Sequence, residues 1–266
     1  DIELEWIDDG TGIIELSWST PDMAKEIIPT EKLYCELKLL VLSCNPRLQS
    51  RGDMRLHEYA NSINDANNIN SREWYESEKH CRDMMQVLYE SSDGNLNYTI
   101  EQWEELQEFT MMTNGTRYND ISGDTLCWAD IYEDSVKALG VKWYDYPDWE
   151  NKGAAFNYDY YINKYNLVDR VNNDEIDEVW LILPHMAKGG SGASESKIVG
   201  IDGSNYWCNP YGIEEDSKWF ILQGVTLNRE VGAQVHAYGH RAECIVKRIY
   251  GYSELKDYGA PEQLLR

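Results

Sequence analysis

Two histidines and a glutamate are spaced so that they share one face of a predicted helix. Apolar residues recur every three or four positions over residues 230–251, as in a helix packed against a core. His236, His240 and Glu243 stand at i, i+4 and i+7, on a second stripe about 110–170° around the helix from the apolar one. Two imidazoles and a carboxylate placed in this way can bind a metal ion or transfer protons.

Of the two chemical interpretations of this stripe, metal-free chemistry is preferred to a metal site, with His240 and Glu243 as an acid/base pair. The stripe lacks the glutamate that directly follows the first histidine in zinc-binding HExxH helices. Zinc is the alternative: His236 and His240 can reach one ion, and His185 or Glu195 would supply a third ligand from another segment. A third interpretation makes these side chains ordinary ion-pair and hydrogen-bond partners on a helix surface.

The elements that must position these groups are predicted from the apolar patterns. Continuous apolar runs predict buried strands at residues 37–44, 177–184 and 219–227, and helical periodicity covers 73–89, 158–171 and 230–251. This alternation predicts an α/β fold, with a mostly parallel sheet flanked by helices. We expect residues 1–30 to form a small N-terminal arm or edge strand, 31–251 a single α/β domain, and 252–266 a C-terminal tail.

The carboxyl ends of the strands are the expected ligand cleft, because open α/β sheets bind ligands there. Residues 45–47, the Gly/Ser-rich loop of 187–196 and residues 226–229 would converge at this edge. Glu195, on that loop, is the third predicted catalytic residue and would close over substrate. Substrate binding is assigned to Arg241, His185, Asn45 and Trp207. For Asn45 the alternative is a turn cap, and for Arg241 it is a surface ion pair.

Charge and composition limit the classes of partner. The chain has 47 acidic and 24 basic residues and a net charge of −23, which argues against binding nucleic acid. No apolar run is long enough to span a bilayer, so membrane insertion is not expected. The sequence starts at Asp1 without Met, as expected for a processed, secreted or extracellular protein.

Aromatic residues and cysteines each leave two interpretations. The chain has 19 Tyr and 10 Trp but only 3 Phe, a balance that suits glycan-binding clefts but also fits compositional drift. Its 6 Cys include no CxxC pair and permit up to three disulfides, although Cys44 and Cys244 also fit buried thiols. Asn97 and Asn114 begin glycosylation sequons, which arise often by chance.

Several motifs follow one another in the order seen in a known group of sequences. The chain resembles a family of uncharacterised secreted bacterial proteins over most of residues 37–250. The resemblance is carried by Asn45-Pro46, Arg117-Tyr118-Asn119-Asp120, the strand 177–183, Glu195-Ser196-Lys197 in a loop, Trp207-Cys208-Asn209-Pro210, the strand 219–225 and Gly239-His240-Arg241-Ala242-Glu243.

This resemblance implies a compartment and an organisation. Members look like parts of larger extracellular proteins, so accessory modules or partner chains are expected, but the family implies no reaction. Relatives carry an aromatic-rich loop where this chain has residues 187–193, and an acidic residue where it has His236. The resemblance therefore favours His240, Arg241 and Glu243 over His236 as site residues.

Two functions from different classes follow. The first is a secreted hydrolase that acts on a glycan or glycopeptide through a His/Glu centre, without a cofactor or with zinc. The second is a non-catalytic extracellular module that binds a glycan or glycoprotein or acts in adhesion.

Overall fold

Apolar runs along the chain form the centre of one six-stranded sheet. The computed structural model describes residues 34–69, 73–147, 156–184, 196–200, 205–207 and 219–250. The strand order is β4-β1-β5-β8-β6-β7. Four neighbouring strands are parallel: β4 (Leu96–Glu105), β1 (Cys35–Ser43), β5 (Glu178–Leu183) and β8 (Trp219–Thr226). β6 (Ser196–Gly200) is antiparallel to β8, and β7 (Asn205–Trp207) is antiparallel to β6. The predicted α/β fold with a mostly parallel sheet is confirmed.

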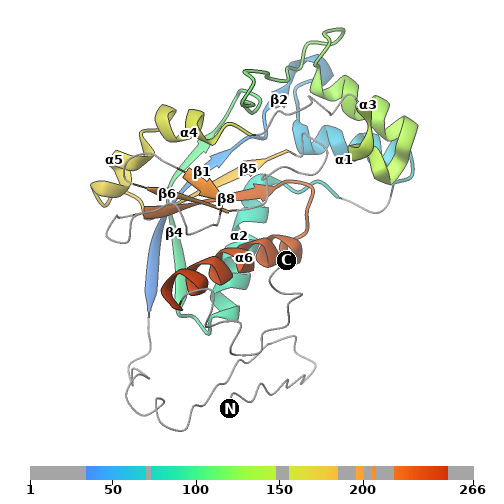
Figure 1. The fold of residues 1–266 in the computed structure, drawn as a ribbon. Coiled ribbons are helices and arrows are strands. Elements are labelled where there is room, and N and C mark those ends of the chain that lie inside the picture. Colours follow the sequence, from blue (N-terminus) through green and yellow to red (C-terminus); the bar gives the residue numbers. More distant parts are fainter. Residues whose placement is uncertain are drawn as a thin grey trace, which may run out of the picture.

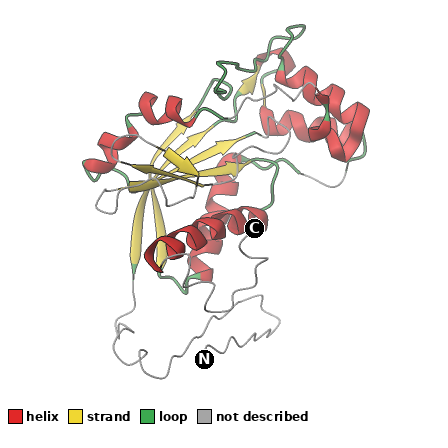
Figure 2. Ribbon diagram, in the orientation of Figure 1, coloured by secondary structure: helices red, strands yellow, loops and turns green. Residues whose placement is uncertain are grey.

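Helices cover both faces of this sheet (Figure 1). α4 (Tyr158–Lys164) and α5 (Leu167–Asn172) pack on the face that contains Leu40 and Leu42. α2 (Ser77–Ser91) and α6 (Val231–Tyr250) pack on the opposite face, which contains Leu39 and Val41. Figure 2 shows the strands between these two helical layers. Consecutive residues of a strand point to opposite faces, so a sheet covered on both sides requires the uninterrupted apolar run that β1 displays.

A third group of elements lies beside the carboxyl ends of the strands (Figure 1). The chain leaves β1 through a small hairpin and enters α1 (Leu56–Ala66), which packs against α3 (Trp128–Leu139). The hairpin consists of β2 (Arg47–Leu48), the 3₁₀ turn η1 (Gln49–Arg51) and β3 (Met54–Arg55), and a second 3₁₀ segment, η2 (Gly140–Asp145), follows α3.

Most tryptophans with described side chains are buried in the core. Three tryptophans pack around Tyr132. The ring centroids of Trp74, Trp128 and Trp143 lie 5.3, 4.9 and 5.0 Å from the centroid of the tyrosine ring. The Trp74 indole donates to the Tyr132 hydroxyl at 2.8 Å, so its polar atom is satisfied while its rings are buried. At these positions the aromatic excess stabilises α1, α2 and α3 rather than lining a cleft.

Three local features differ from the sequence expectation. Ser196 and Lys197, expected in a loop, are buried in β6. The expected helix over 158–171 is divided into α4 and α5 at Asn166, which adopts a left-handed conformation with φ 52°. The antiparallel strands β6 and β7 were not expected, because short segments carry weak periodicity.

Some expectations lie outside the described residues: the arm 1–30, the tail 252–266, and the loop up to Glu195. In the part of the chain that is described, no helix is long and apolar enough to cross a membrane. Four cysteines whose side chains are described are free thiols: Cys35 is exposed, and Cys44, Cys81 and Cys127 are buried.

Candidate functional site

The carboxyl edge of the sheet has a topological switch point between β1 and β5. From β1 the chain moves to β4 on one side, and the next parallel strand, β5, joins on the other side. Main-chain hydrogen bonds hold the strand ends together: Cys44 donates to Ile182 at 2.8 Å, and Leu227 donates to Leu183 at 2.9 Å. The ends of β1, β5 and β8 therefore meet at one edge, while the Gly/Ser-rich loop expected there lies outside the described residues up to Glu195. α/β proteins bind ligands at such switch points.

Asn45 and His57 form a buried pair at this edge. Asn45 lies two residues after the end of β1, and His57 is the second residue of α1. The Asn45 side-chain oxygen accepts from the His57 main-chain N–H at 3.1 Å, and the Asn45 Nδ2 lies 2.8 Å from His57 Nδ1. The Leu56 N–H also donates to Pro46 at 3.0 Å. These bonds satisfy first-turn donors of α1 and hold the imidazole rigidly against the strand end.

This arrangement selects one protonation state of His57. Because the Asn45 oxygen is used by a main-chain donor, its NH₂ group must face Nδ1 of the ring. Nδ1 then acts as an acceptor, so the ring is neutral and its proton is on Nε2. Burial lowers the pKa of His57 and outweighs the charges of Glu58 and Glu76, which raise it. The positive end of the α1 dipole also lowers this pKa. His57 therefore presents a fixed Nε2–H donor.

Further polar groups extend the edge from His57 toward α2 and α6. Glu76 caps α2 by accepting from the main-chain N–H groups of residues 78 and 79 at 3.0 and 2.7 Å. The Tyr75 main-chain N–H donates to the Leu227 carbonyl at 2.8 Å, which joins the segment before α2 to the end of β8. Asn228 and Gln234 follow there, 4% and 0% exposed, and each has a side-chain oxygen without a hydrogen-bond partner in the described structure. Unsatisfied buried oxygens of this kind call for a bound water or ligand group.

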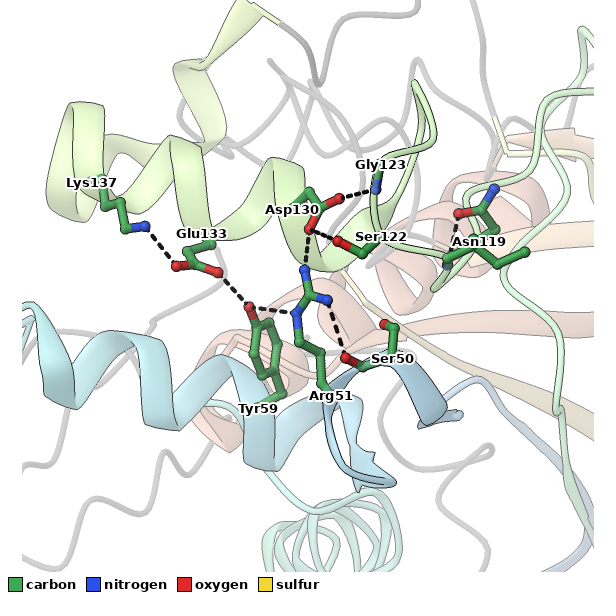
Figure 3. A network of polar contacts seen from close by, with 10 residues as sticks. Ser50, Arg51, Tyr59, Asn119, Ser122, Gly123, Asp130, Glu133 and Lys137 are labelled. Atoms are coloured by element: carbon green, nitrogen blue, oxygen red, sulfur yellow. Dashed lines mark hydrogen bonds and ion pairs between the residues drawn. The ribbon is translucent and has the colours of Figure 1, made fainter.

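An ion-pair network supports the α1 side of the edge (Figure 3). Arg51 pairs with Asp130 of α3, and its Nε donates to the Tyr59 hydroxyl at 3.2 Å. Tyr59 donates to Glu133 at 2.9 Å, and Lys137 completes the chain by binding Glu133 at 2.6 Å. The network links η1 and α1 to α3, so it fixes the helix that carries His57.

His236 and His240 are brought together, but on the outer side of α6. Both are exposed, and their Nε2 atoms lie 3.2 Å apart. The predicted second stripe of α6 is thus present at these two positions, while Val231, Val235 and Tyr238 pack on the core as expected. The separation suits two ligands on one tetrahedral ion. Within the described residues, however, no group of three or more potential ligands is present.

Arg241 has a different role from the expected substrate contact. It is 7% exposed and forms a buried ion pair with Glu178, the first residue of β5. Its guanidinium also donates to the hydroxyls of Tyr238 at 2.6 Å and Tyr98 at 3.2 Å. Trp180 donates to Glu178 at 2.7 Å. Because Glu178 begins β5, this cluster lies at the amino edge of the sheet, opposite Asn45 and His57.

The remaining predicted site residues are only partly located. Asn45 lies at the predicted edge, where its side chain caps α1. Trp207 ends β7, at the far side of the sheet from β1. His185, Glu195 and the side chain of Glu243 lie outside the described structure.

Sequence reasoning missed two buried histidines, His57 and His80. His57 follows a predicted strand and a turn-rich hairpin, a position where the first turn of a helix reaches the ligand edge. His80 is 1% exposed, neither ring nitrogen has a hydrogen-bond partner in the described structure, and its ring stacks on Tyr75 with centroids 4.8 Å apart. The chain was compared with protein families, curated proteins and solved structures, and none of them matches it.

Proposed function

We propose that this protein is a secreted hydrolase of a glycan or glycopeptide whose site lies at the carboxyl edge of the sheet. The observation that supports the proposal is the imidazole of His57, held by Asn45 with Nε2–H as a donor at the switch point between β1 and β5. The hydrolase class and the substrate class extend the sequence expectation; the site moves from the α6 stripe to His57.

The chemistry assigned to His57 is hydrogen-bond donation to an oxygen of the substrate. A neutral imidazole can stabilise negative charge that develops on a carbonyl or leaving-group oxygen, and it requires no rearrangement if its orientation is fixed beforehand. Removal of one such donor lowers kcat by roughly 10²–10³ in enzymes of this kind. Glu195, a carboxylate predicted from the sequence, is the proposed acid/base partner. Glu243 follows Arg241 by two residues on α6, toward the opposite edge of the sheet, and takes no part in this proposal.

Asn45→Asp provides the sharpest test, because it changes the tautomer and keeps the shape. The carboxylate still accepts from the His57 main-chain N–H, but it also accepts from Nδ1, so Nε2 loses its proton to that nitrogen. We expect the variant to fold and to lose kcat about as severely as His57→Ala, by roughly 10²-fold.

A screen of glycan and peptide substrates supplies the assay. Wild type is compared with Asn45→Asp, His57→Ala, His240→Ala and Glu243→Gln, each checked for folding by circular dichroism. Full turnover by His57→Ala would exclude the proposed site. Loss of turnover only in His240→Ala and Glu243→Gln would place the chemistry on α6.

A non-catalytic glycan-binding module is the second candidate. It is favoured by one observation: in the described residues, Asn45 is the only side chain hydrogen-bonded to the His57 ring, so no nucleophile or carboxylate is paired with it. A glycan array that finds a ligand, combined with the absence of product from every bound glycan, would support this candidate over the hydrolase.

A further inference from the structure

A small pocket lies at the carboxyl end of β4, the strand that pairs with β1. It has a volume of about 160 Å³ and is bounded by the segment 105–109 and by Tyr160, Lys164 and Tyr165 from α4 and the residue that follows it. Pockets for drug-sized ligands or dinucleotides are about two to six times larger. The space corresponds to about five water molecules, which is the scale of one sugar ring.

The pocket belongs to the same edge as the proposed catalytic group. Glu105, on its wall, forms an ion pair with Arg55 at 2.8 Å. Arg55 also donates to the Asn45 carbonyl at 3.4 Å and lies two residues before His57. A chain of direct contacts through Arg55 and Asn45 therefore joins the wall of the pocket to His57, and both lie at the same edge of the sheet.

The charges around the pocket favour an uncharged ligand. Lys164 Nζ lies 5.4 and 5.5 Å from the ring centroids of Tyr160 and Tyr165, so a cationic ligand would meet a resident cation at the aromatic rings. Glu108 pairs with Arg117, and its carboxylate lies 3.8 Å from Lys164 Nζ. The negative charges of Glu105 and Glu108 would repel an anionic ligand. Each charge is already compensated within the protein, and a charged ligand would have to displace a partner.

The lining nevertheless has many groups that can bind hydroxyls. The main-chain N–H groups of Gln107, Glu108 and Phe109 donate to no other main-chain group of the described residues. Tyr160 and Tyr165 are half-buried and provide ring surfaces, and Glu108 and Lys164 are exposed at the rim. Uncharged hydrogen-bonding groups, aromatic surface and a volume for one ring together match a sugar.

We propose that this pocket binds one neutral sugar residue of the substrate and holds the glycan across the edge of the sheet toward His57. The inference rests on the proposed glycan substrate, and it names the charge and size of the unit bound. It also separates binding from chemistry, because the pocket residues and His57 come from different elements.

Titrations with defined trisaccharides test the proposal, and saturation-transfer NMR measures the binding. The neutral probes are trimers of glucose, mannose and N-acetylglucosamine, and the charged probes are trigalacturonate and the glucosamine trimer. We expect a neutral trimer to bind at least about tenfold more tightly than either charged one. Tyr165→Ala and Lys164→Met should each weaken that binding by about tenfold, which is the loss of one aromatic or hydrogen-bond contact.

Two variants act as controls. Tyr89→Ala removes a tyrosine that is 43% exposed on α2 and should leave binding unchanged. His57→Ala should retain sugar binding while losing turnover, so a failed hydrolase proposal and a failed pocket proposal give different results. The pocket proposal is overturned if no neutral trimer binds, if a charged trimer binds more tightly, or if Tyr165→Ala and Lys164→Met both bind as wild type does.

Discussion

The buried imidazole of His80 should make the stability of this protein depend steeply on pH below neutrality. Burial lowers the pKa of His80 to about 4, and the ring has no hydrogen-bond partner in the described structure that could stabilise a charge. In the unfolded chain the same ring titrates near its ordinary pKa of about 6.5. Between these values the unfolded state binds a proton that the folded state does not, so the free energy of unfolding falls as the pH falls.

The magnitude follows from the two pKa values. The whole difference corresponds to about 3 kcal/mol, which is fully lost only below pH 4. Between pH 7 and pH 5 the expected loss from His80 alone is about 2 kcal/mol. Replacement by Phe removes the titration and retains a flat ring that can stack on Tyr75.

Urea unfolding at pH 7 and pH 5 measures this effect in wild type and His80→Phe. We expect the loss of unfolding free energy over this interval to be smaller in His80→Phe by about 2 kcal/mol. His236→Gln is a matched control because that ring is exposed on α6 and stays in contact with solvent on folding. An unchanged pH dependence in His80→Phe, with equal m values, would refute the assignment of a buried, neutral His80.

Three further predictions concern other buried or paired groups. Arg241→Met should lower the unfolding free energy by about 3–5 kcal/mol, because it leaves the Glu178 carboxylate buried without its partner. In thermal or urea unfolding, the double variant with Glu178→Gln should recover part of this loss. Protein purified without chelator should contain less than about 0.1 equivalent of zinc by elemental analysis, because the His236–His240 helix lacks the adjacent glutamate of zinc-binding HExxH helices; one equivalent that is lost in His240→Ala would contradict this. Asp130→Asn should lower the unfolding free energy by about 1–3 kcal/mol, since Arg51 loses its charged partner, and a wild-type urea midpoint would show that the network is not stabilising.

The strands and long helices were predictable because burial on both faces leaves a strong apolar pattern. The run 37–44 corresponds to β1, and the run 219–227 corresponds to β8. α3 was missed although its buried residues recur at helical spacing: Trp128, Ile131, Tyr132, Ser135 and Val136 share one face. This pattern could have been read from the sequence.

The candidate site was less predictable because its central contact joins residues that only the folded hairpin brings together. Asn45 and His57 are separated by β2, η1 and β3, and no local pattern indicates that the amide of one faces the ring of the other. The inward direction of Arg241 was not fixed by helical phase either. At about 100° per residue it stands roughly 80° around the helix from Val231, at the flank of the apolar stripe, and only the buried carboxylate of Glu178 explains why it points inward.

The position of β8 in the sheet has a consequence for folding during synthesis. The chain makes β5, then β6 and β7, and only afterwards β8, yet β8 lies between β5 and β6. Until β8 emerges from the ribosome, β5 presents an unpaired edge and the β6–β7 ribbon has no strand to join. The pairings that close the sheet therefore form last and across long chain separations, which favours slow completion and exposes an apolar edge to chaperones or to other nascent chains.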